Sequence, residues 1–157
     1  MVSDTYNNII QEFNESGRFL HLFGSKGSLL DQFCYPHNVC YDKEHYQLLV
    51  ADTENQRVCL WSHETCSKPL CISHIQLKNE CFSVCVDPFR NHQLLIGTTC
   101  NVLVYDSRNN KIPIQILGSS NNGSKLGEFH SVTDLCINEV NGTLIVVDAW
   151  NDRIQVF

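Results

Sequence analysis

The stretch LVADTENQRVCLW at residues 49–61 decides the fold of this chain. It returns at residues 145–157 as IVVDAWNDRIQVF, and a more divergent copy, MVSDTYNNIIQEF, occupies residues 1–13. An Asp, an Asn and a final aromatic residue hold the same positions in each copy: Asp4, Asn7 and Phe13; Asp52, Asn55 and Trp61; Asp148, Asn151 and Phe157. The chain is therefore a repeat protein with a period of about 48 residues.

Each repeat is a succession of short β-rich runs separated by turn residues, and few segments carry apolar residues at helical spacing. The predicted strands cover residues 1–5, 9–13, 19–23, 39–42, 47–52, 57–61, 70–77, 82–87, 93–98, 112–117, 132–138, 143–148 and 153–157, with one more ending at Tyr105. Four short antiparallel strands in a repeat of about 40 to 50 residues are typical of a propeller blade. We therefore predict an all-β fold, a β-propeller of four-stranded antiparallel blades.

The strand pattern divides the chain into about three and a half blades. It assigns a partial blade to residues 1–30, blades to residues 31–77 and 78–117, and a partial blade to residues 118–157. Each blade has apolar faces that only a neighbouring blade can cover. If the chain is expressed alone, the faces and edges at its two ends are expected to favour self-association.

Composition excludes several classes of protein. With 157 residues, of which 43% are apolar, the chain can bury the core of a folded domain. The net charge of −6 is spread without blocks of either sign, which disfavours binding dominated by contacts to phosphates. No apolar run reaches the roughly 18 to 20 residues of a membrane helix, and the N-terminus does not resemble a signal peptide. We expect a cytoplasmic protein that does not bind membranes.

The nine cysteines point to packing and not to a disulfide framework. Cys40, Cys85 and Cys136 hold one position in successive repeats, between larger apolar residues, as buried fillers would. Another cluster contains metal-ligand residue types, namely Cys66, Cys71, His74, Cys81 and Cys85. Its spacings do not form the paired C-x2-C arrangement of a structural zinc site, so we predict neither a metal nor another cofactor.

These motifs resemble the NHL repeat, whose pattern is roughly P-x-G-V-A-V-D, a turn, and then I-Y-V-A-D-T-x-N-H-R-I-Q-V-F. The corresponding segments here are PHNVCYD at residues 36–42, LVADTENQRV at 49–58 and NDRIQVF at 151–157. GRFLHLFG at residues 17–24 is similar to the G-x-F-x-x-x-F-G sequence that often lies between copies. The chain departs from the pattern at Asn38, where glycine is usual, at Ile9, which replaces the arginine, and at Thr98, which replaces the aspartate.

The resemblance implies both a fold and a set of functions. NHL domains are typically closed propellers of about six blades, so the resemblance implies that this chain is a segment of a longer protein. Many serve as the substrate-recognition part of RING or tripartite-motif ubiquitin ligases, with the ligase activity in another domain. Some bind RNA, and the class also resembles a metal-dependent amidating lyase of the secretory pathway. A protein-binding module is the preferred prediction, RNA binding is the alternative, and an enzyme is the least favoured.

Two sets of residues are candidates for a role. The repeated polar set is predicted to hold turns together and not to catalyse a reaction, because a catalytic group has no reason to recur in every blade; it comprises Asp4, Asp52, Asn55, Arg57, Asp148, Asn151 and Arg153. The predicted partner-binding set lies in the loops before the inner strands and at the turn tips, and comprises Tyr35, His37, Asn38, Glu54, His130 and Trp150. Trp150 is the expected contact anchor, because it is an aromatic residue at a turn tip and aromatic residues are enriched in binding hot spots.

Overall fold

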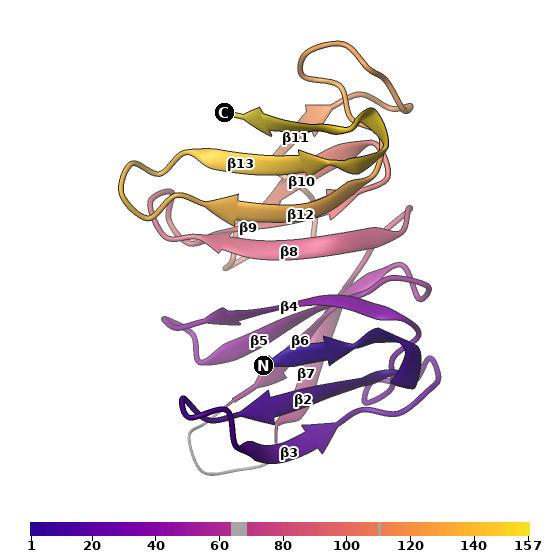
Figure 1. The fold of residues 1–157 in the computed structure, drawn as a ribbon, viewed down its shortest axis with the longest axis vertical. Helices are drawn as coiled ribbons and strands as arrows, with labels where there is room; N and C mark the ends of the chain where they lie inside the picture. The colour runs from indigo at the N-terminus through magenta and orange to yellow at the C-terminus, as the bar shows by residue number, and fades with distance from the viewer. Residues whose placement is uncertain (64–68, 110) are drawn as a thin grey trace. The chain divides into compact units, whose positions relative to one another are not determined.

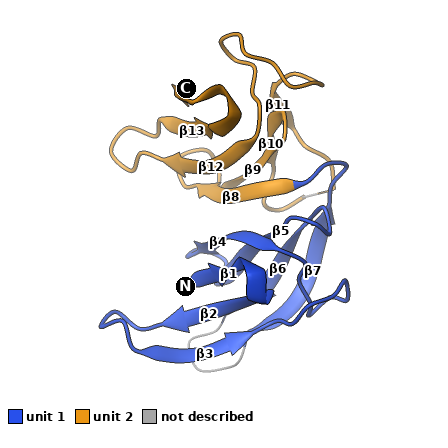
Figure 2. Cartoon of the chain, turned by 45° about the vertical axis from the view of Figure 1, so that its right-hand side comes forward, with its two compact units in different colours: residues 1–80 blue, residues 81–157 orange. Residues whose placement is uncertain are grey.

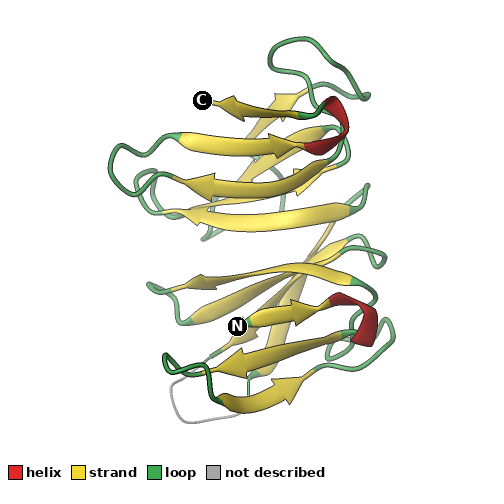
Figure 3. Cartoon of the chain, in the orientation of Figure 1, coloured by secondary structure: helices red, strands yellow, loops and turns green. Residues whose placement is uncertain are grey.

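The computed structural model describes residues 1–63, 69–109 and 111–157 and confirms the all-β prediction (Figures 1 and 3). Its strands are β1 (Val2–Asp4), β2 (Ile9–Phe13), β3 (Phe19–Phe23), β4 (Pro36–Asp42), β5 (Gln47–Asp52), β6 (Arg57–Ser62), β7 (Leu70–Gln76), β8 (Cys81–Asp87), β9 (Gln93–Thr98), β10 (Asn101–Tyr105), β11 (Gln115–Gly118), β12 (Val132–Ile137), β13 (Leu144–Asp148) and β14 (Arg153–Val156). The helical segments are two single 3-10 turns, η1 (Thr5–Asn7) and η2 (Ala149–Asn151). Among the described residues, no helix has the length and apolar character needed to span a membrane.

The strands form four antiparallel sheets whose strand orders are β1-β2-β3, β4-β5-β6-β7, β8-β9-β10-β11 and β12-β13-β14. In every sheet, strands that are consecutive in sequence are also hydrogen-bonded neighbours. Sheets of three or four sequential antiparallel strands have the size and connectivity of whole and partial propeller blades.

The chain separates into two compact units, Met1–Glu80 and Cys81–Phe157, shown in blue and orange in Figure 2. In the first unit, the core joins β2 and β3 to β5 and β6 around three aromatic rings. The ring of Trp61 lies 4.9 Å from that of Phe23 and 5.4 Å from that of Phe33. Ile10, Leu48 and Val50 complete this buried cluster. Trp61, the aromatic residue that ends this copy of the repeat motif, thus supplies the core of the first unit.

In the second unit, β12 packs against β8 and β9. Gly97 in β9 allows the close approach, because a Cβ atom at this position would lie 2.7 Å from Cγ1 of Val132 and 3.0 Å from its carbonyl oxygen. Leu135 in β12 is buried, whereas the next residue, Cys136, is exposed. The prediction that Cys136 is a buried filler is therefore wrong, while Cys85 is buried and Cys40 is half-buried.

Two strand starts differ from the predictions by three residues. β4 begins at Pro36, three residues earlier than predicted, so His37 and Asn38 belong to a strand and not to a loop. A bulge between Pro36 and Asn38 accommodates this start, and proline is tolerated as the first residue of an edge strand. β11 begins only at Gln115, because Pro113 lacks the N–H group that a longer ladder would need.

Candidate functional site

Asp52 is the centre of a buried polar cluster at the end of β5. Its Oδ2 atom accepts hydrogen bonds from Nε of Arg57 at 2.7 Å and from Nδ2 of Asn55 at 2.8 Å. Its Oδ1 atom accepts the backbone N–H of Cys34 at 2.6 Å. The carboxylate is fully buried, so these donors replace the water that a buried charge would otherwise lack.

Arg57 extends this cluster to the loop between β3 and β4. Its guanidinium group donates to three backbone carbonyl oxygens of the loop, those of Ser28 at 3.0 Å, Leu29 at 2.7 Å and Gln32 at 2.9 Å. Asn55 donates to a fourth, the carbonyl of Gly27, at 2.9 Å. The motif therefore fastens a connecting loop to the β5–β6 turn, and we call this arrangement the loop clamp.

The loop clamp recurs in the second unit with the same geometry. Arg153 Nε lies 2.7 Å from Oδ2 of Asp148, and Oδ1 of Asp148 accepts the backbone N–H of His130 at 2.7 Å. Arg153 and Asn151 also donate to four carbonyl oxygens of the preceding loop, those of Gly123, Ser124, Lys125 and Glu128. The side chain of Arg153 is 24% exposed whereas that of Arg57 is 6% exposed, so the second clamp is closer to solvent.

The other two copies have weaker ties. Within residues 1–63, 69–109 and 111–157, the side-chain donors to Asp4 are neutral, Asn7 at 3.0 Å and Gln11 at 2.7 Å, and Ile9 stands where the arginine would be. In the third copy, Thr98 Oγ1 accepts the backbone N–H of Asn101 at 3.2 Å, a local turn contact. The loss of the charged residues thus removes the long-range part of the clamp.

Sequence reasoning missed one clamp position, which lies two residues after the arginine. Gln155 donates to Asp148 at 3.1 Å, and Cys59 Sγ lies 3.8 Å from Oδ2 of Asp52 at the equivalent place. Gln11 makes the corresponding contact to Asp4. The recurrence of Gln at this position in the first and last copies was the signal that could have revealed it.

The surroundings of Asp148 shift its ionisation. Burial alone would raise the pKa of this carboxyl group. Hydrogen bonds from the His130 backbone, Asn151 and Arg153, together with the positive charge of Arg153, lower it. The lowering is larger, so the pKa of Asp148 lies below its ordinary value of 3.8. A carboxyl group whose folded-state pKa is lowered stabilises the fold above the unfolded-state pKa, and this stability is lost as the pH falls through the folded-state value.

We therefore expect the Asp148 clamp to contribute to acid resistance. The free energy of unfolding should fall as the pH drops below about 4, and Asp148→Asn should flatten this dependence because the variant carries no titrating group. Urea unfolding at several pH values from 3 to 7 measures the effect. The control is Asp134→Asn, which removes an exposed carboxylate from β12 of the same unit. This variant should keep the wild-type dependence of the unfolding free energy on pH. An unchanged slope in Asp148→Asn would contradict the prediction.

The structure brings two of the predicted partner-binding residues together in the second unit. The rings of His130 and Trp150 lie 5.2 Å apart at an interplanar angle of 39°. The backbone N–H of Trp150 donates to the carbonyl of His130 at 3.1 Å, and His130 is held in turn by Asp148. Trp150 is nevertheless 72% exposed. The pair is therefore an exposed aromatic contact on a fixed backbone.

The other four predicted residues lie in the first unit and are arranged differently. The ring of Tyr35 contacts that of Tyr6, which sequence reasoning did not place in the partner-binding set, with centroids 5.8 Å apart and planes at 79°. Tyr6 is 85% exposed.

The remaining predicted residues do not form such a pair. Glu54 is exposed, and its backbone N–H donates a hydrogen bond to the carbonyl oxygen of Cys34 at 3.1 Å. His37 is exposed on β4 and Asn38 is half-buried in that strand. Tyr6 and Trp150 occupy equivalent turn tips, a correspondence that the aligned copies already contained.

One member of the cysteine and histidine cluster considered as a metal site, Cys71, is paired with Cys59, which is not part of that cluster. A hydrogen bond with Cys59 lowers the pKa of Cys71, whereas the same contact and burial raise the pKa of Cys59. Cys71 lies on the wall of a hollow of about 760 Å³ that Trp61 and Asp31 also line. Cys81 and Cys85 are buried in the second unit, and Cys66 lies outside the described residues.

Comparison with known proteins supports the repeat and the fold. The NHL repeat matches residues 33–59, which include the Asp52 clamp. None of the curated proteins matches the chain. Among solved structures, a chain of Kuenenia stuttgartiensis hydrazine synthase is similar with a TM-score of 0.66 and 10% sequence identity, over 92% of this chain and 37% of that one. At this identity the likeness concerns the fold alone. NHL repeats generally mediate protein interactions, and this all-β chain of blade-like sheets contains one at residues 33–59.

Proposed function

We propose that this chain is a protein-binding module in which each unit has its own contact residues, at a turn tip and in the loop that precedes β4 in the first unit or β12 in the second. The observation that carries the proposal is the His130–Trp150 pair: a large exposed indole ring packs at a tilt against the ring of His130, and Asp148 of the loop clamp holds the backbone of His130. Buried aromatic anchors contribute much of the binding energy of protein interfaces. A side chain that is already ordered loses less entropy on binding, so a fixed pair is a better anchor than a mobile one.

The Tyr6–Tyr35 pair in the first unit supports the same proposal independently. Both residues are exposed, and Asn8 holds the backbone N–H of Tyr35 through a hydrogen bond of 2.9 Å. Tyrosine combines a broad apolar face with a polar end and is common at interfaces. Each unit therefore presents one supported aromatic pair.

We further propose that the bound partner is the substrate of a ubiquitin ligase of the RING or tripartite-motif type, with ligase activity in a separate domain. The NHL repeat is the support for this assignment. We also propose a reducing, cytoplasmic location, in which cysteines such as Cys85 serve as small apolar packing residues.

Loss of the aromatic pair is expected to abolish partner capture. The variant His130→Ala/Trp150→Ala removes both rings but keeps the backbone contacts, so the fold should persist and recovery of a cross-linked partner should fall by at least about tenfold, the equivalent of one hot-spot residue. The measurement is quantitative cross-linking of the purified chain to its partner in extract. Val140→Ala, on the exposed turn between β12 and β13, is the matched control and should retain full capture. Equal capture by both variants would exclude this surface.

RNA binding is the competing function, and a salt titration distinguishes it from protein binding. Contacts to phosphates release counterions, so RNA affinity should rise steeply as the ionic strength falls. With a net charge of −6 the chain should show no such rise with RNA hairpins. A steep salt dependence would replace the protein-binding proposal.

A further inference from the structure

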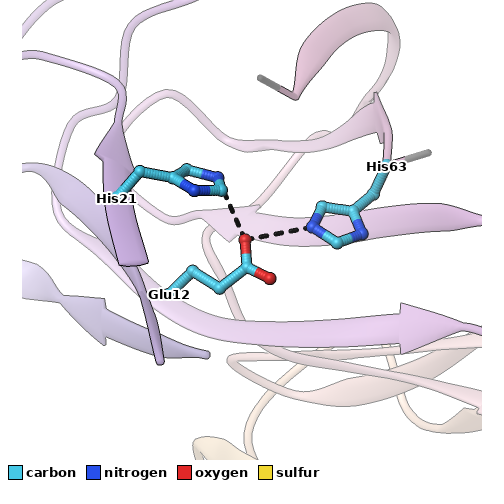
Figure 4. Close-up of side chains that lie close together, drawn as sticks. All are labelled: Glu12, His21 and His63. Atoms are coloured by element: carbon cyan, nitrogen blue, oxygen red, sulfur yellow. Dashed lines mark hydrogen bonds and ion pairs between the residues drawn. The ribbon is translucent and has the colours of Figure 1, made fainter. Parts of the chain in front are cut away.

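Three side chains with metal-binding atoms converge in the first unit, outside the surface proposed above (Figure 4). Glu12 lies in β2, His21 lies opposite it in β3, and His63 directly follows β6. Nε2 of His21 and Nε2 of His63 each lie 3.0 Å from Oε2 of Glu12. One ligand atom from each residue lies within 4.8 Å of the other two. The cluster thus brings two imidazoles and one carboxylate to a single point.

Hydrogen bonding within the cluster does not satisfy all its members. His63 Nε2 forms a hydrogen bond with Glu12. His21 Nε2 is equally close to the same oxygen, yet it is shielded from solvent and has no hydrogen-bond partner among the described residues. A buried polar atom without a partner costs free energy. A metal cation between the three side chains would be coordinated by this nitrogen and so satisfy it.

The spacing of the cluster matches the ligand shell of a zinc ion. Bonds from Zn²⁺ to histidine nitrogen and carboxylate oxygen are about 2.0–2.1 Å long, and a tetrahedral arrangement then separates neighbouring ligand atoms by about 3.3 Å. The separations of Oε2 of Glu12 from Nε2 of His21 and from Nε2 of His63 are both 3.0 Å, so these two contacts need to open by only a few tenths of an ångström, and the two histidine nitrogens lie within 4.8 Å of each other. Two histidines and one acidic residue are a known zinc ligand set that leaves a fourth position for water.

The backbone around the cluster is well supported. Glu12 and His21 are opposite residues of one antiparallel pair, and the β-ladder sets their separation. The backbone N–H of His63 donates to the carbonyl of Tyr46 at 2.9 Å, and its ring packs edge-on against Tyr41 with centroids 5.6 Å apart. The side chains of Glu12 and His63 are each 14% exposed, so an ion would be partly shielded from water. Fixed ligands on strands favour a defined site over adventitious binding.

We propose that Glu12, His21 and His63 form a zinc site that joins the β1-β2-β3 sheet to the end of β6. Oε2 of Glu12 and Nε2 of both histidines are the protein ligands, and water takes the fourth position. The ion cross-links two sheets of the first unit. Its role is to stabilise that unit, because a ligand that binds only the folded state shifts the equilibrium towards it.

The test is a Zn²⁺ titration of the full chain with a competing chelator, together with thermal unfolding with and without the ion. The wild-type chain should bind one equivalent at this site, and its melting temperature should rise with Zn²⁺. His21→Ala, His63→Ala and Glu12→Gln should each weaken binding by at least about 100-fold, because even outer-shell changes cost 10- to 100-fold. Their melting temperatures should no longer respond to the ion.

Two controls keep the proposal falsifiable. His45→Ala removes another histidine of the first unit, one that pairs with Asp42 at 2.7 Å, and should leave the Zn²⁺ affinity unchanged. Co²⁺ substitution reports the ligand type, and the proposed site predicts a spectrum without thiolate charge transfer. Glu12→Gln is the mildest change and is the deciding variant if a histidine variant does not fold. Tight Zn²⁺ binding that survives Glu12→Gln, a thiolate band, or the absence of one-equivalent binding would each overturn the proposal.

Discussion

Replacing Arg57 by alanine is expected to lower the free energy of unfolding by about 3–5 kcal/mol, the range for breaking a buried ion pair. The loss is large because Asp52 is fully buried and would keep its charge without its cationic partner. The change also removes the donors to three carbonyl oxygens of the loop before β4. Urea unfolding followed by far-UV circular dichroism measures the difference.

The second clamp supplies the matched control. Arg153→Ala removes the same ion pair and the same type of loop contacts, but the Arg153 side chain is 24% exposed, so water can solvate the remaining Asp148 charge. We expect the loss to be smaller than that of Arg57→Ala. Equal losses in the two variants would show that burial does not determine the strength of the clamp.

The repeat pattern predicted most of the fold, because strand formation and turns depend on local residues. The strand starts at residues 9, 19, 93 and 153 agree with the structure, since each follows a turn that contains Asn or Gly. The Asp–Arg pairing was also predictable, because the two residues flank one turn and recur together. Local rules failed at Pro36 and Pro113, where a bulge and a missing N–H group decided where pairing began.

The sequence did not predict which side chains are buried or which residues meet in the candidate sites, because both depend on contacts between segments that are distant in the chain. Cys40, Cys85 and Cys136 share one repeat position but differ in exposure, because packing between sheets decides which face is covered. The Tyr6–Tyr35 contact joins the tip of one sheet to the entry of the next. Glu12 and His63 lie 51 positions apart and meet only after both sheets of the first unit have formed. A scan for metal-ligand spacing along the sequence could not detect that convergence.

Replacing Trp61 by alanine is expected to destabilise the first unit by about 3–5 kcal/mol, the range for removing a large core aromatic residue. Trp61 is 3% exposed and contacts both Phe23 and Phe33, so its loss leaves a cavity between three strands and the loop before β4. Backbone pairing on both sides of β6 prevents the walls from closing this space.

Trp61→Phe separates the packing contribution from the polar one. Nε1 of Trp61 is buried without a hydrogen-bond partner among the described residues, and such a donor costs about 1–3 kcal/mol. Phenylalanine keeps one ring and removes this donor, so we expect less than half the loss of Trp61→Ala in urea unfolding. Trp150→Ala, at a site 72% exposed, is the control and should change the stability by no more than about 0.5 kcal/mol. Equal losses in Trp61→Phe and Trp61→Ala would contradict this expectation, because they would mean that a phenyl ring recovers none of the packing that the indole provides in this core.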